Sequence, residues 1–101
     1  MPTCSRWERL IAWAEKEGNS YKALEFKEKL VECIVYTAQE KIIKGKLREA
    51  EELLKYGKDV AKRLGIEELS FHISLLEKQA AEKRERRKAA QEKRKTQAQA
   101  K

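Results

Sequence analysis

The sequence predicts an all-α protein: a small three- or four-helix bundle with an extended basic C-terminal helix. Glycine and proline are scarce, with four Gly and one Pro in 101 residues, so little interrupts a helix. Charged residues make up 41% of the chain, and many of them are Glu and Lys, which favour helices. Apolar residues recur at helical spacing in segments separated by glycines, which commonly end helices.

The first predicted helix spans residues 5–17. Ser5 and Glu8 have the spacing of a capping box, in which each side chain binds the backbone N–H of the other residue. One apolar stripe follows the helical spacing: Trp7, Leu10, Ile11 and Ala14. Gly18 is expected to end this helix in a left-handed conformation.

The second predicted helix spans residues 20–44 and ends at Gly45. Its apolar face is the broadest in the chain, so we expect it to be the most buried helix. The third predicted helix spans residues 46–64 and ends at Gly65. Gly57 lies on its apolar stripe although Gly destabilises a helix by about 1 kcal/mol relative to Ala. We therefore expect another helix to approach closely there.

The predicted core draws on all four helices and includes Leu10, Leu24, Leu30, Val31, Ile34, Val35, Leu47, Leu54, Ala61, Leu64, Leu69, Ile73 and Leu76. The aromatic side chains are interpreted as core or edge residues rather than as platforms for stacked bases. Trp13 and Tyr56 are expected to be the most exposed of them.

The fourth predicted helix begins near Ile66 and continues without Gly or Pro into a basic segment. Residues 78–101 hold ten of the 24 bases and three of the 17 acids, a net charge of +7. Residues 1–77 keep 14 of each and are neutral. After Leu76 no Leu, Ile, Val, Met or aromatic residue follows. The chain is therefore divided into a helical bundle, 1–77, and a basic C-terminal helix or tail, 78–101.

No enzymatic or metal chemistry is predicted. Cys4 and Cys33 form no C-x-x-C pair and His72 is the only histidine, so a zinc site with four closely spaced ligands cannot be assembled. Cys33 is interpreted as a small buried hydrophobe, with a Cys4–Cys33 disulfide as the alternative. No catalytic set or phosphate-binding glycine loop is recognisable, so no cofactor is predicted.

The predicted location is cytoplasmic. No signal peptide pattern is present, and the longest apolar runs fall far below the roughly 20 residues of a membrane span. The basic segment also has no apolar face to insert into a membrane, so no membrane partner is predicted.

The basic segment is the main functional candidate. Its Lys and Arg predict contacts with the phosphates of RNA or, as the weaker choice, DNA, because neutralising phosphates releases counterions. Such contacts do not read sequence. A ribonucleoprotein such as the ribosome would be a fitting context. A purely solubilising or coiled-coil end and an acidic protein partner are the alternatives. The candidate nucleic-acid-binding residues are Lys78, Lys83, Arg84, Arg86, Arg87, Lys88, Lys93, Arg94 and Lys95.

Two stretches resemble known helical families. The spacing of small and apolar residues after Gly45 resembles the turn and second helix of a tetratricopeptide repeat: Gly45, Leu47, Ala50, Leu54 and Gly57. Residues 7–64 resemble the MIT domain, a three-helix bundle, through Gly18-Asn-Ser-Tyr-Lys-Ala-Leu24. This resemblance implies a groove that binds a partner helix. It makes a protein–protein adaptor the second functional hypothesis, and no binding residue carries over.

Overall fold

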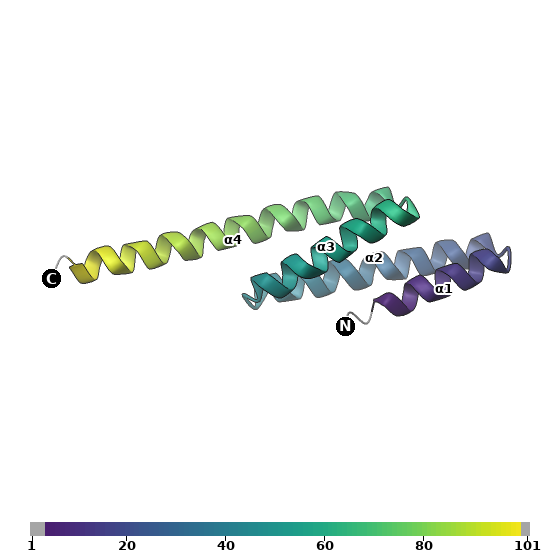
Figure 1. Cartoon of the computed structure of the whole chain (residues 1–101), viewed down its shortest axis with the longest axis horizontal. Coiled ribbons are helices and arrows are strands. Elements are labelled where there is room, and N and C mark those ends of the chain that lie inside the picture. Colours follow the sequence, from purple (N-terminus) through teal and green to yellow (C-terminus); the bar gives the residue numbers. More distant parts are fainter. Residues whose placement is uncertain (1–3, 100–101) are drawn as a thin grey trace.

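The chain forms four helices in a computed structural model that describes the backbone of residues 4–99 and the side chains of residues 4–90. They are α1 (Ser5–Lys16), α2 (Ser20–Ile43), α3 (Leu47–Leu64) and α4 (Glu67–Gln99) (Figure 1). The described residues contain no strand, so the predicted all-α bundle is confirmed. The three glycines predicted to end helices all have left-handed φ, at 72°, 80° and 66° for Gly18, Gly45 and Gly65.

Helix α2 lies at the centre of the bundle. It packs against each of the other three helices, and α3 also packs along α4. Figure 1 shows that α1 covers one half of α2, whereas α4 runs along α3 and continues past the turn between α2 and α3. The molecule is consequently elongated, with extents of 70 × 22 × 15 Å.

The core forms where α2, α3 and α4 meet, with α1 closing one side. Its largest fully buried side chains include Ile11, Leu30, Ile34, Leu54, Leu69 and Ile73. Leu24 was predicted in this core but is 59% exposed. The first turns of α2 extend beyond the end of α3 and the start of α4 (Figure 1). Neither α3 nor α4 therefore covers the first turns of α2. Leu10, Val35 and Leu64 are half-buried rather than fully enclosed.

The aromatic residues differ from the prediction in several places. Trp13 is exposed as expected, but Tyr21, Tyr36 and Phe71 are also exposed and do not belong to the core. Tyr56, which was expected to be exposed, is half-buried and packs against the core. Its position along α3 places its hydroxyl against α1.

Glu8 joins α1 to α3 instead of forming a capping box. Its carboxylate accepts a hydrogen bond from the Tyr56 hydroxyl and one from Arg63 Nη2 at 2.9 Å. Helix α1 begins one residue earlier than a Ser5 cap would require: Cys4 occupies the cap position, and no side-chain cap forms. Burial raises the pKa of Tyr56 far above its usual range, and the hydrogen bond to Glu8 and the Glu8 charge add to this shift.

Gly57 lies where three helices meet. A Cβ added at Gly57 would come within 2.8 Å of Ile73 Cδ1 on α4 and 2.9 Å of Ile34 Cγ2 on α2. The close helix approach that the sequence predicted at this glycine is therefore confirmed.

A disulfide between Cys4 and Cys33 ties the start of α1 to the middle of α2, with Cα atoms 5.7 Å apart. The interpretation of Cys33 as a simple buried hydrophobe is therefore wrong, and the alternative pairing is confirmed. Helices α1 and α2 are antiparallel, so Cys4, which directly precedes α1, lies opposite Cys33. Among the described residues no group of His, Cys, Asp and Glu is arranged to hold a metal ion. No helix in the described part of the chain is long and apolar enough to span a membrane.

Candidate nucleic-acid interface

The face of α4 that packs on the body changes from apolar to cationic along the helix. Its buried residues follow steps of four and three: Leu69, Ile73, Leu76 and Ala80, all between 0% and 4% exposed. The same steps continue to Lys83 and Arg87. Because residues three and four apart share one face of a helix, these two cations point toward the body. The predicted division at residue 78 stays a prediction, and α4 crosses it as one continuous helix.

Lys83 caps the end of α2. Its Nζ donates hydrogen bonds to the backbone carbonyl oxygens of Ile42 at 2.6 Å and Ile43 at 2.9 Å. The last carbonyl oxygens of a helix lack N–H donors within that helix. A cation at this end also offsets the negative end of the helix dipole. Lys83 therefore fixes α4 against the α2 terminus.

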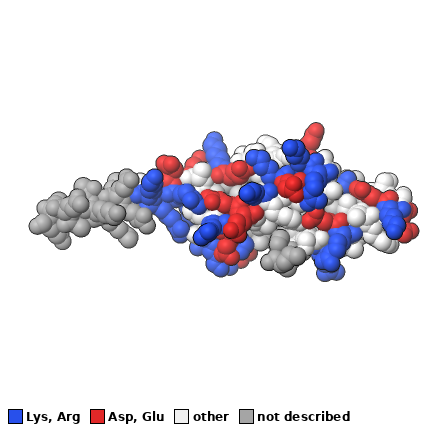
Figure 2. Space-filling view, in the orientation of Figure 1, with Lys and Arg blue, Asp and Glu red and all other residues white. Residues whose placement is uncertain are grey.

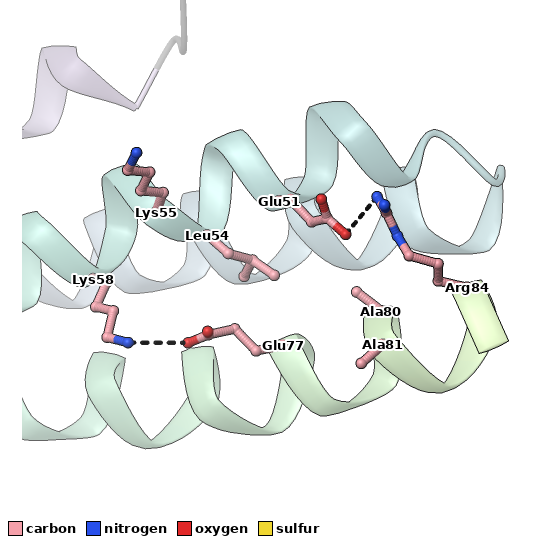
Figure 3. Close-up of a pocket in the computed structure, with 8 residues that line it drawn as sticks. All are labelled: Glu51, Leu54, Lys55, Lys58, Glu77, Ala80, Ala81 and Arg84. Carbon is pink, nitrogen blue, oxygen red and sulfur yellow. Dashed lines mark ion pairs between the residues drawn. The ribbon is translucent and has the colours of Figure 1, made fainter.

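Arg84 joins α4 to α3. Its Nη2 lies 2.7 Å from Glu51 Oε1 on α3. Earlier along α4, a Glu77 carboxylate oxygen lies 3.9 Å from Lys58 Nζ on α3. A hollow of about 450 Å³ lies between α3 and α4, and its lining includes both ion pairs, Leu54 and Ala80. Figure 3 shows the two ion pairs bridging the helices, with Leu54 between them. Both pairs are exposed, and exposed ion pairs add little stability, so burial of the apolar face of α4 remains the main contribution to its packing.

Arg87 lies over the turn between α2 and α3. A Cβ added at Gly45 would collide with the Arg87 guanidinium, and Gly45 has a φ of 80°, which other residues rarely adopt. The left-handed turn therefore calls for glycine at this position, whereas the Arg87 guanidinium is the end of a flexible, exposed side chain that could move aside.

Of the remaining candidate cations, those with described side chains form no hydrogen bond or ion pair with the body. Lys78, Arg86 and Lys88 are exposed, and no described carboxylate lies within ion-pair distance of them. The cluster Lys93, Arg94 and Lys95 belongs to α4, but its side chains lie outside the described residues. The nine candidates thus divide into residues that contact the body, residues exposed on α4, and residues whose side chains are not described.

A basic hollow of about 620 Å³ opens where α4 passes the α2–α3 turn. Its lining comes from the turn, the start of α3, and α4: Gly45, Lys46, Leu47, Arg48, Glu49, Arg84, Arg87 and Lys88. Figure 2 shows Lys and Arg gathered where the described surface of α4 meets its grey end, whereas both charges alternate over the body. We call the basic hollow beside the α2–α3 turn the turn hollow.

Sequence reasoning missed two cations of the turn hollow, Lys46 and Arg48. Both lie in the segment whose net charge is zero, so a charge count gave no reason to select them. Their position beside Gly45, together with the register that directs Arg87 to the same turn, was the available signal.

The surroundings of the turn are electropositive. The pKa of the Glu40 carboxyl, near the end of α2, is lowered by a hydrogen bond from Lys44 and by the Lys44 charge. The charges of Lys41 and Lys46 lower it further.

Comparison with known families identifies the group to which this chain belongs. The family model of archaeal ribosomal protein aL49 matches residues 3–87, which is most of the chain. No curated protein matches this chain. The chain therefore belongs to this ribosomal protein family, which supports a role as a ribosome component without enzymatic activity.

The resemblance to MIT domains and tetratricopeptide repeats is wrong, because the ribosomal family covers the same residues. The positions that suggested it have general packing roles. Gly18 and Gly45 end helices with positive φ, and Ala23 and Ala50 are buried against neighbouring helices. Any antiparallel helical bundle needs such residues at such places.

Proposed function

We propose that this member of the archaeal ribosomal protein aL49 family binds ribosomal RNA through the phosphate backbone, using the cations of α4. The observation that carries the proposal is the charge distribution: residues 78–101 hold the whole net charge of +7. Family membership makes RNA the expected nucleic acid, and ribosomal proteins the expected neighbours. The adaptor hypothesis is not retained, because it depended on the MIT resemblance.

The structure suggests two roles among the candidate cations. Lys83, Arg84 and Arg87 contact the body and would set the direction in which α4 leaves it. The others would reach phosphates. We call five of them the arm cations, Lys78, Arg86, Lys93, Arg94 and Lys95. Lys88 stands apart because it also lines the turn hollow.

Such an interface would bind tightly without reading bases. Lys and Arg contacts to phosphates position a protein on its nucleic acid, while sequence is read through base edges. An extended helix carrying several cations can follow the backbone of a folded RNA over several phosphates.

The test replaces all five arm cations with Gln in the full chain and measures binding to a fluorescein-labelled RNA hairpin by anisotropy. Truncation after Glu77 is unsuitable, because it would also remove the buried Ala80 and the capping Lys83. Loss of several phosphate contacts is expected to weaken binding by about tenfold or more.

A charge-matched control removes five exposed cations from the body: Arg6, Arg9, Lys16, Lys55 and Lys62. This control has the same net charge as the arm variant. We expect it to retain most of the affinity of the original protein. Equal losses in both variants would mean that only net charge matters, and the proposal would be wrong.

A further inference from the structure

We propose that the turn hollow binds a backbone phosphate of RNA, held by Lys46, Arg48, Arg87 and Lys88. This inference rests on the proposed function and names one point at which the RNA backbone is held. It adds two residues of the otherwise neutral body to the interface.

The hollow has an excess of positive charge. Two of its cations, Lys46 and Arg48, come from the α2–α3 turn and the start of α3, and two, Arg87 and Lys88, come from α4. The ion pairs between described residues include none of these four cations. Folding therefore brings cations from distant parts of the chain to one place.

The two other charged residues of the lining are already paired. The Glu49 carboxylate, the only acid among the described residues of the lining, lies 3.5 Å from Lys41 Nζ. Arg84 pairs with Glu51. An anion entering the hollow would meet little opposing negative charge.

The backbone at the start of α3 adds hydrogen-bond donors. The first N–H groups of a helix have no acceptor within it, and Lys46, the residue at the cap position of α3, makes no side-chain capping bond. In α2 the corresponding position is filled, since Asn19 Oδ1 accepts a hydrogen bond from the Lys22 N–H at 3.0 Å. Uncapped N–H groups at the positive end of a helix suit a phosphate.

The end of α2 does not oppose an anion at the same turn. Its terminal carbonyl oxygens, on Ile42 and Ile43, already accept hydrogen bonds from Lys83. The partial negative charge of this helix end is therefore offset, while the positive end of α3 stays available. The cations, the free N–H groups and the offset carbonyls all favour the same ligand.

The test is the double variant Lys46→Gln/Arg48→Gln in the full chain, titrated with the same labelled RNA hairpin. Neither side chain is buried, so the melting temperature is expected to stay near that of the original protein. Binding is expected to weaken about tenfold, and the plot of log K against log salt to become shallower by about one unit.

The matched control is Lys55→Gln/Lys62→Gln, which removes the same charge from exposed positions farther along α3. A double variant that binds RNA no more weakly than this control would overturn the phosphate site. If the arm variant then still loses affinity, the proposed function stands without the hollow. If neither the arm nor the hollow variant loses more than its control, both proposals fail.

A second probe separates phosphate from other anions. Binding of labelled poly-glutamate is expected to change less between the double variant and its control than binding of RNA does. Equal losses for poly-glutamate and RNA would identify the hollow as a site for acidic protein segments and contradict the phosphate assignment.

Discussion

The two halves of the inward face of α4 share one register but hold the helix to the body by different means. In the first half, Leu69, Ile73 and Leu76 are buried in the core. In the second half, Lys83 and Arg87 occupy the continuing positions. Lys83 donates hydrogen bonds to carbonyl oxygens at the end of α2, and the Arg87 guanidinium lies beside Gly45 in the α2–α3 turn. The first half stabilises the fold by burial. The second half directs a charged helix past the body and lines the turn hollow.

The comparison shows that the number of cations in a segment does not describe what each cation does. Lys83 and Lys78 are the same residue type on the same helix, yet one bonds to two carbonyl oxygens and the other is exposed. A difference in helix register accounts for this, because one faces the body and the other faces away. Substitutions in each half should therefore separate stability from binding.

The largest effect is expected in the apolar half. Leu76→Ala should destabilise the protein by about 2–5 kcal/mol, because Leu76 is 4% exposed and its removal leaves a cavity. The neighbouring Leu75 is 46% exposed, so Leu75→Ala should change stability by less than about 1 kcal/mol. Urea denaturation measures both. Similar losses for the two variants would contradict the packing of α4 described above.

A smaller effect is expected where α3 meets the apolar half. Gly57→Leu should destabilise by about 1–3 kcal/mol, because its side chain would overlap Ile73 and Ile34. The control is Lys55→Leu, which places the same residue on the exposed face of α3 and should change stability by about 0.5 kcal/mol or less. A rise in melting temperature for Gly57→Leu would rule out the close helix approach.

The smallest effect on stability is expected in the cationic half. Lys83→Met removes the donor to two carbonyl oxygens and should destabilise by about 0.5–1.5 kcal/mol. Lys78→Met removes the same charge from an exposed site and should change stability by about 0.5 kcal/mol or less. Thermal melts of both variants would settle the point. If Lys83→Met were as neutral as Lys78→Met, Lys83 would not anchor α4.

The sequence predicted the helices well because local signals determine where they end. Glycines with left-handed φ follow the first three helices, and apolar spacing marks the faces. Leu24 was misplaced because its exposure depends on how far α2 extends beyond its neighbours. Glu8 was misassigned because Cys4, not Ser5, occupies the cap position of α1, and because Tyr56 and Arg63, distant in sequence, bind its carboxylate.

The candidate site was predicted only in part, for a similar reason. The basic segment is visible as a charge imbalance, but the turn hollow forms only when α4 passes the α2–α3 turn. Lys46 and Arg48 are unremarkable in a neutral segment until folding places them beside Arg87 and Lys88. Extending the apolar register of α4 beyond Ala80 would have identified Lys83 and Arg87 as residues facing the body.

The central claim is that the cations of α4 bind the RNA backbone, and the salt dependence of binding tests it most directly. Titration of the full chain with a labelled RNA hairpin over a range of salt concentrations gives the slope of log K against log salt. With about four to six phosphate contacts, the slope should lie between roughly −3 and −5. A slope near zero would contradict the account, because binding would then not depend on neutralising phosphates.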